Sequence, residues 1–296
     1  MSDQSYAVIV RHIRLSLAIA KVPLCLLVSF SALFGYVFAA EELSLQAFIV
    51  SGAVFFLSCG GASLNSYQER YRDGLMSRTR NRPLVQKQPS DIVAVLQGIF
   101  LVAAGLTTIF LLGGFFPFLA GLSGILLYNF VYTRLKPLSL YAIIPGAVCG
   151  ALPPYIGWLA AGADPFSLEA FLPVMLLFFY QIPHFFLVLL RYKSDYAGNV
   201  APNMLRYLSE QSLRRIFLPW VTALATTMIT FSIVPTDLGS WEKLIIVGNS
   251  VILISLFYYQ MLFKSHPDYT LLFRYLNLSL FLLMLTVCVG LSKKML

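Results

Sequence analysis

Charged residues are scarce in this chain of 296 residues. They make up 11% of the sequence, whereas a soluble domain carries roughly 25%. Hydrophobic residues make up 58% and include 24 phenylalanines and 16 tyrosines. This balance excludes an ordinary soluble domain, a disordered chain and a nucleic-acid-binding module. The apolar residues gather into long runs, which is typical of a polytopic membrane protein.

Cysteine and histidine patterns that bind metals are also absent. The four cysteines lie far apart inside apolar runs and form no CxxC pair, so we expect buried thiols. The three histidines form no HExxH motif, which argues against a zinc site, and the chain contains no P-loop, GxSxG or GxGxxG motif. The first apolar run, about 22–40, is too long for the apolar core of a signal peptide. We therefore expect it to remain as a membrane span.

Nine segments are apolar over the roughly 20 residues that a helix needs to cross a bilayer. The sequence therefore predicts an all-α membrane protein with one transmembrane domain, residues 1–296. The predicted spans are about 20–40, 46–66, 92–113, 115–133, 139–161, 168–191, 216–236, 243–263 and 271–291.

Basic residues are distributed unevenly between the predicted connections. With the N-terminus in the cytoplasm, all but three of the 21 lysines and arginines fall on the cytoplasmic side, the exceptions being Lys243, Lys293 and Lys294. Both long polar connections, about 67–91 and about 192–215, then lie in the cytoplasm, and we expect function there. This asymmetry and the attraction to anionic lipid headgroups account for the net charge of +8 without any nucleic acid.

The second predicted span ends in three oxygen-bearing side chains at helical spacing. Asn65, Glu69 and Asp73 are four residues apart, so they lie along one face of a helix that Gly74 can end. Carboxylates combined with substrate phosphate oxygens are the ligands that Mg²⁺ prefers. The spacing therefore predicts a magnesium site at the membrane surface.

Three arginines follow these acids within five residues, in Arg78-Thr-Arg80-Asn81-Arg82-Pro83. Planar guanidinium groups bind phosphate oxygens in pairs. The rule for cytoplasmic basic residues would explain the arginines alone, but not two acids and an amide in helical register with them. Acids beside arginines indicate a diphosphate ligand. A polyprenyl diphosphate fits, since its other end can lie in the membrane.

The approach to the second long connection contains a histidine in the middle of a span. His184 follows Pro183, which removes a backbone donor from the helix, and an ionisable residue at membrane depth is usually functional. The alternative is a neutral histidine that bonds to a neighbouring helix or to a carbonyl freed by Pro183. Lys193 and Asp195 lie at the cytoplasmic end, where Asp195 either forms a surface ion pair or faces the first connection as a further metal ligand.

These residues resemble a known family. The pattern of Asn65, Glu69 and Asp73, followed by Arg78-Thr-Arg-Asn81-Arg82-Pro83-Leu84, is similar to the first motif of the UbiA superfamily of intramembrane prenyltransferases. Four further stretches resemble the branch of that superfamily whose members farnesylate protoheme IX. They are residues 132–136, 146–158, 181–185 and, more loosely, 193–205.

The resemblance implies nine helices around a central cavity open to lipid, a Mg²⁺ cofactor, and farnesyl diphosphate and protoheme IX as substrates. It also implies a location in a bacterial inner membrane. Implied metal and catalytic residues are Asn65, Glu69, Asp73 and Asp195. Implied diphosphate-binding residues are Arg78, Arg82, Lys136 and Lys193, while His184 contacts heme through iron or a propionate. Aromatic rings that shelter an allylic cation would be Tyr67, Tyr132 and Tyr196.

Three positions depart from the family pattern. Glu69 replaces the usual Asp, Tyr71 stands where this branch often has another Asp, and Ser194 replaces an acid commonly found beside the equivalent of Asp195. We therefore expect a less acidic metal site with activity retained. Two alternatives stay open: a UbiA-type enzyme with another aromatic acceptor such as a quinone precursor, and a non-catalytic transporter or channel. A transporter would place ionisable residues along a pathway at the bilayer midplane, whereas here they cluster at one membrane face.

Overall fold

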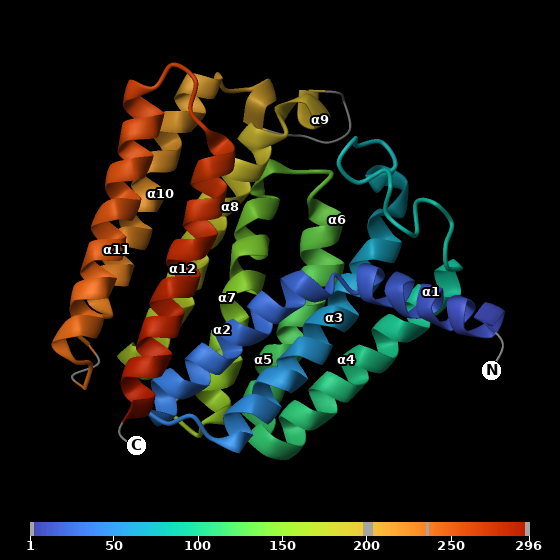
Figure 1. Ribbon diagram of the computed structural model, residues 1–296, viewed down its shortest axis with the longest axis horizontal. Coiled ribbons are helices and arrows are strands. Elements are labelled where there is room, and N and C mark those ends of the chain that lie inside the picture. Colours follow the sequence, from blue (N-terminus) through green and yellow to red (C-terminus); the bar gives the residue numbers. More distant parts are fainter. Residues whose placement is uncertain (1–2, 198–203, 235–236, 294–296) are drawn as a thin grey trace.

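The computed structural model describes residues 3–197, 204–234 and 237–293, and these are helical without any strand. The helices run roughly side by side in a bundle (Figure 1). The first half of the chain forms α1 (Asp3–Ile19), α2 (Val22–Ala40), α3 (Leu45–Asp73), α4 (Asp91–Gly113), α5 (Phe115–Leu126), η1 (Leu127–Tyr132), α6 (Thr133–Leu135), η2 (Leu140–Ala142) and α7 (Ile143–Ala160). The second half forms α8 (Leu168–Arg191), α9 (Lys193–Ala197), η3 (Met204–Arg206), α10 (Glu210–Thr230), α11 (Ser240–Tyr258), η4 (Tyr259–Phe263) and α12 (Tyr269–Ser292).

Each predicted span corresponds to one long helical rod, which confirms the all-α membrane fold. Eight rods in the described part of the chain are long and apolar enough to cross a membrane. The remaining predicted span, 216–236, corresponds to α10, which is not among these eight. This helix begins earlier than predicted, at Glu210, and carries Arg214 and Arg215 in its second turn.

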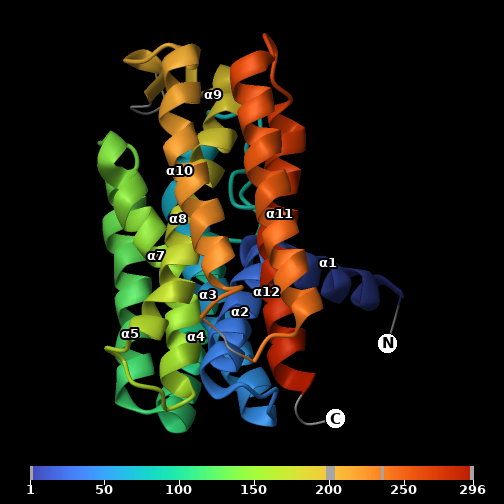
Figure 2. The same cartoon turned by 90° about the vertical axis from the view of Figure 1, so that its left-hand side faces the viewer.

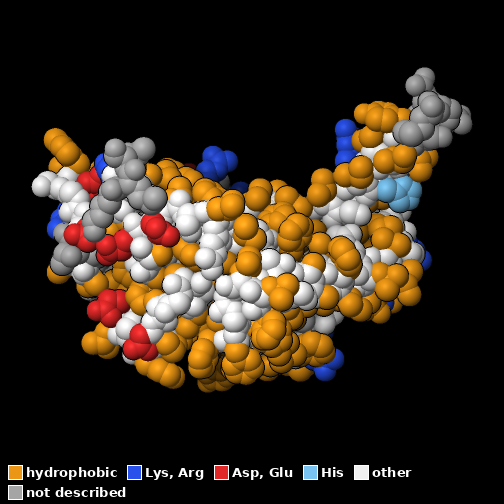
Figure 3. Space-filling model, turned by 90° about the horizontal axis from the view of Figure 1, so that it is seen from below, with side chains coloured by type: hydrophobic (Ala, Val, Ile, Leu, Met, Phe, Trp, Pro, Cys, Tyr) orange, Lys and Arg blue, Asp and Glu red, His pale blue; other side chains and the backbone are white. Residues whose placement is uncertain are grey.

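The outer surface of the bundle is largely apolar, as a lipid environment requires. Large hydrophobic side chains are exposed on several helices, for example Phe100 on α4, Leu244 on α11 and Phe263 in η4. Hydrophobic side chains likewise cover much of the face shown in Figure 3. Water would disfavour such a surface, so the bilayer is its natural solvent.

The bundle is held together where small residues let helix backbones approach closely. A methyl group on Gly35 of α2 would overlap the carbonyl oxygen of Pro154 on α7, and one on Gly157 would overlap the carbonyl oxygen of Ala32. Lipid provides no hydrophobic drive for helix association, so close van der Waals packing at small residues stabilises such pairs. The motif around residues 146–158 therefore has a packing role between α2 and α7.

Helix α1 lies outside the bundle and was not expected from the sequence. It projects from the molecule at a large angle to the long helices, and Figure 2 shows the same arrangement from the side. The chain leaves α1 through Lys21, whose backbone is left-handed with φ 53°. This sharp turn sends the chain into α2 and brings the Lys21 side chain to the end of α3.

Candidate active site

The three polar side chains on the last turns of α3 all point into the protein. Asn65 is 2% exposed, Glu69 is 7% exposed and Asp73 is 6% exposed. Their spacing of four residues places them along one inward face, as the helical register predicts. Buried carboxylates are costly unless a cation or hydrogen bonds compensate their charge.

Each of these side chains is paired with a cation from another part of the chain. Lys21 Nζ donates to Asn65 Oδ1 at 2.8 Å. Lys136 Nζ lies 2.9 Å from Glu69 Oε1, and Arg82 Nη1 lies 2.6 Å from Asp73 Oδ2. Three cations from three different segments therefore converge on one helix face.

A π-helical turn positions Lys136 and the aromatic rings beside it. In η1 the rings of Tyr128 and Tyr132 stack with centroids 5.9 Å apart, and Lys136 Nζ lies 5.8 Å above the Tyr132 ring. Asn65 Nδ2 donates to Thr133 Oγ1 at 3.0 Å, which ties this turn to α3. Turns of this kind are frequent at functional sites because they redirect side chains within a helix.

The first long connection folds back over the end of α3. Thr79 Oγ1 donates to the backbone carbonyl of Asp73 at 2.8 Å, and the following turn carries Arg82 to the Asp73 carboxylate. A cavity of about 40 Å³, lined in part by Lys21, Ser66, Asp73 and Arg82, lies against this segment. Arg82 is therefore placed at the acids by the fold of its own loop.

Asp195 on α9 joins the two long connections. Its Oδ1 accepts hydrogen bonds from the Ser77 hydroxyl at 2.5 Å and the Ser77 amide at 3.1 Å, and its Oδ2 accepts from the Arg78 amide at 3.3 Å. These bonds, foremost the one from the Ser77 hydroxyl, lower the pKa of Asp195 below its usual value. Of the two alternatives left open for Asp195, a surface ion pair or a position facing the first connection, the structure has the second, with Asp195 against the backbone of that loop.

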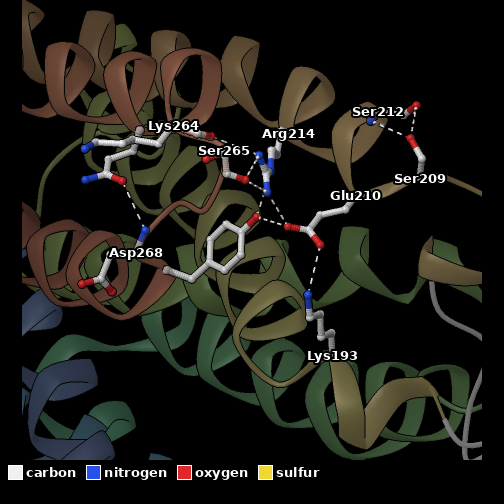
Figure 4. A network of polar contacts seen from close by, with 10 residues as sticks. Lys193, Ser209, Glu210, Ser212, Arg214, Lys264, Ser265 and Asp268 are labelled. Carbon is white, nitrogen blue, oxygen red and sulfur yellow. Dashed lines mark hydrogen bonds and ion pairs between the residues drawn. The ribbon is translucent and has the colours of Figure 1, made fainter.

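Other predicted site residues lie apart from the paired acids. The guanidinium of Arg78 packs over the Tyr192 ring at 5.1 Å. Lys193 forms a salt bridge with Glu210 of α10 at 3.2 Å, within a network that includes Arg214 (Figure 4). Arg70 covers the Tyr67 ring at 4.1 Å, and the side chain of Tyr196 lies outside the described residues.

His184 lies between α8 and α12. Its Nδ1 is 2.9 Å from the hydroxyl oxygen of Tyr180, and its ring packs against Phe273 with centroids 5.0 Å apart. The Tyr180 hydroxyl in turn donates to Asn277 Oδ1. The expected alternative of a bond to a carbonyl freed by Pro183 has no counterpart among the described contacts: Nδ1 contacts the Tyr180 hydroxyl, and Nε2 forms no hydrogen bond with the described residues.

The comparisons with known proteins agree with this arrangement. The model of the UbiA prenyltransferase family matches residues 28–287. The chain belongs to the UbiA prenyltransferase family. It is thus an integral membrane prenyltransferase, and a transporter no longer fits.

Three curated relatives of this prenyltransferase share the name protoheme IX farnesyltransferase. The relative from Nitratidesulfovibrio vulgaris strain DP4 is 29% identical over 229 residues, which is 77% of this chain and 80% of the relative. The one from strain Hildenborough is 31% identical, covering 69% of this chain and 71% of the relative. The relative from Geobacter sulfurreducens is 36% identical, covering 62% and 67% respectively.

Solved structures share the fold of this prenyltransferase. A digeranylgeranylglyceryl phosphate synthase superposes with a TM-score of 0.76 at 14% identity, covering 96% of this chain and 99% of that one. A UbiA homologue from Archaeoglobus fulgidus, bound to GPP and Mg²⁺, superposes with a TM-score of 0.66 at 16% identity, covering 94% and 99%. At these identities the likeness establishes the fold.

The oxygen donors on α3 suit a divalent cation chemically, since carboxylates and an amide oxygen are hard ligands. Within the described part of the chain, however, no group of three or more acidic, histidine or cysteine side chains gathers as a cluster that could hold a metal. Lys136 and Arg82 form salt bridges with the carboxylates of Glu69 and Asp73, while the loop backbone donates a hydrogen bond to Asp195. Metal ligation by this set stays a prediction.

Several residues of the site were missed by sequence reasoning. Lys21 was not predicted as a site residue, yet it binds Asn65. Asn129 of η1 is fully buried; its Nδ2 donates to the Gly61 carbonyl at 3.0 Å, and its Oδ1 has no hydrogen-bond partner among the described residues. Gln68 donates to the Asn129 carbonyl at 3.2 Å. The available signal was polarity within a span: Asn129 is an amide in the middle of an apolar run.

Proposed function

We propose that this prenyltransferase transfers a farnesyl group from farnesyl diphosphate to a vinyl group of protoheme IX and releases diphosphate. The observation that carries the proposal is the shared name of the curated relatives, which align with 62–77% of the chain. The family match spans the acids of α3, the arginine loop, Lys136 and His184.

The paired acids and cations support binding of a metal diphosphate. A diphosphate needs cationic donors, and a Mg²⁺ ion needs carboxylates, so the two ligands together satisfy both halves of each ion pair. In the proposal Asn65, Glu69, Asp73 and Asp195 hold Mg²⁺, and Arg82 and Lys136 turn to the diphosphate. Arg78 and Lys193 join them after leaving the Tyr192 ring and Glu210.

The proposed reaction starts with cleavage of the bond between C1 of the farnesyl group and the diphosphate oxygen. Both electrons of this bond leave with the diphosphate, and bound Mg²⁺ would stabilise the charge on that oxygen. Arg82 and Lys136 act on the same developing charge, which favours the transition state over the bound substrate. Tyr132 lies beside Lys136 and offers a ring face to the allylic cation.

The acceptor then forms the new carbon–carbon bond. The vinyl π electrons attack C1, which leaves a cation on the vinyl carbon next to the porphyrin. Water adds there and loses a proton, giving a hydroxyethylfarnesyl side chain. His184 on α8 is the proposed contact of the heme.

The test is a reaction with the purified chain in lipid nanodiscs, supplied with Mg²⁺, farnesyl diphosphate and heme b. We expect release of diphosphate together with a heme whose mass has increased by one farnesyl group and one hydroxyl. A matched reaction receives 4-hydroxybenzoate in place of heme. Prenylated 4-hydroxybenzoate with unchanged heme would overturn the heme assignment and keep prenyl transfer; no diphosphate release with either acceptor would overturn both.

A further inference from the structure

A chain of hydrogen bonds fixes the orientation of His184 inside the bundle. Tyr180 and His184 lie one turn apart on α8, and Asn277 faces them from α12. The hydroxyl of Tyr180 contacts both His184 Nδ1 and Asn277 Oδ1. Each contact needs one donor and one acceptor, so the proton positions can be worked out starting from Asn277, the last member of this series of hydrogen bonds.

The Asn277 amide supplies the starting point. Its Nδ2 lies 2.6 Å from the backbone carbonyl of Phe273. A carbonyl oxygen can only accept, so the amide nitrogen must face it and the amide oxygen must face Tyr180. Asn277 Oδ1 also only accepts, and the single proton of the Tyr180 hydroxyl is therefore donated to Asn277.

The tautomer of His184 follows from this assignment. Because the Tyr180 proton points to Asn277, the Tyr180 oxygen presents a lone pair to His184. A neutral imidazole carries a proton on one nitrogen only, and the contact at 2.9 Å requires that proton on Nδ1. Nε2 is then unprotonated, and it forms no hydrogen bond with the described residues.

We propose that Tyr180 and Asn277 are positioning residues that hold His184 in the Nδ1–H tautomer, so that Nε2 offers its lone pair to the iron of the heme acceptor. An unprotonated Nε2 cannot donate to a propionate carboxylate, whereas neutral imidazole nitrogen is a common ligand of heme iron. The identity of this ligand rests on the proposed function. The tautomer does not, because it follows from protein contacts alone.

The tautomer can be measured without any substrate. In protein labelled with ¹⁵N-histidine, an unprotonated ring nitrogen resonates far downfield of a protonated one, and a His184→Gln sample identifies which of the three histidine signals belongs to His184. We expect Nδ1 to be protonated and Nε2 to be unprotonated. The opposite pattern would overturn the proposal.

Two variants test the two positioning residues separately. Asn277→Leu removes the acceptor of the Tyr180 proton, so Tyr180 can donate to Nδ1 and we expect the proton of His184 to move to Nε2. Tyr180→Phe removes the partner of Nδ1, and we expect averaging of the two tautomers. Asn249→Leu is the matched control, since Asn249 forms a comparable buried amide network with Ser279 between α11 and α12 and does not touch His184. An unchanged His184 signal in both test variants would refute the proposed role of Tyr180 and Asn277.

The ligand is tested with ferric protoporphyrin IX and no prenyl donor. We expect an absorption spectrum of imidazole-ligated iron that is lost in His184→Ala, and binding that is several-fold weaker in Asn277→Leu than in Asn249→Leu. If His184→Ala keeps the spectrum, the proposed ligation of iron by His184 is wrong. The tautomer is tested separately by the ¹⁵N data. The acceptor of the proposed function is tested separately by the prenyl-transfer assay with heme or 4-hydroxybenzoate, whose outcome does not depend on either of these results.

Discussion

The salt bridge between Arg82 and Asp73 predicts a stability defect that magnesium repairs. Asp73 is 6% exposed and depends on Arg82, whose Nη1 lies 2.6 Å from its carboxylate. Arg82→Gln keeps a polar side chain, although a shorter one, and removes the charge. The carboxylate would then be buried without a cation, unless another cation reaches it.

The size of the defect can be worked from the exposure of the two partners. Removing one partner of a fully buried pair costs roughly 3–5 kcal/mol, whereas an exposed pair contributes about 0–1 kcal/mol. The side chain of Arg82 is 31% exposed and that of Asp73 is 8% exposed, so the pair lies between these limits. We expect a loss of about 1–3 kcal/mol, which lowers the melting temperature by several degrees.

The assay is thermal unfolding in nanodiscs with and without Mg²⁺. If Asp73 is a metal ligand, Mg²⁺ replaces the lost charge and stabilises Arg82→Gln more than it stabilises the parent. At a hundredfold excess over the variant's dissociation constant, the stabilisation of the variant is about 2.7 kcal/mol. Arg78→Gln is the control, since Arg78 forms no salt bridge among the described residues. Equal destabilisation of both variants, or a Mg²⁺ response equal to that of the parent, would refute the reasoning.

Three further predictions concern the acids, the helix packing and the loop contact. Glu69→Asp should keep far more prenyl transfer than Glu69→Gln, because the shorter acid keeps the charge that pairs with Lys136; equal rates in a diphosphate-release assay would contradict this. Gly157→Ala should lower the free energy of unfolding by roughly 1–3 kcal/mol through overpacking against Ala32, which a lower melting temperature would report, while Gly248→Ala, which has open space, should be neutral or slightly stabilising. The pKa of Asp195 is lowered by Ser77, so its contact stabilises the loop above the usual aspartate pKa and is lost only as the pH falls through the lowered value. The protection of residues 74–90 against hydrogen exchange should therefore stay constant from pH 5 to 8, because Asp195 keeps its charge over this range. Asp195→Asn should lose this protection. A loss of protection near pH 6 in the parent would contradict the prediction.

The membrane fold could be predicted from the sequence because each span is a local property. A run of apolar residues must satisfy its backbone within its own helix, whatever its neighbours do. The helix α1 escaped prediction because it is not apolar throughout: Ile9, Ile13 and Leu17 recur at helical spacing beside Arg11 and Arg14. The π-helical turn η1 was also out of reach, since it adds one residue to a turn without any change of apolar pattern.

The candidate site was predictable on α3 and much less so beyond it. The spacing of Asn65, Glu69 and Asp73 fixes their common face through helix geometry alone. Their partners depend on how distant segments pack, and no local pattern carries that information. Lys136 lies 67 positions from Glu69, and Lys21 lies 44 positions from Asn65.

The pairing also shows why the same residues can serve both stability and binding. Three cations meet two carboxylates and an amide, so the group carries one net positive charge within the described contacts. A divalent cation alone would add to that charge, whereas a diphosphate alone would compete with Glu69 and Asp73 for Lys136 and Arg82. Binding both together leaves each carboxylate facing a cation and each basic side chain facing an anion. The charges of the site would therefore favour the proposed metal diphosphate over either part alone, and the internal ion pairs compensate the buried charges when no ligand is bound.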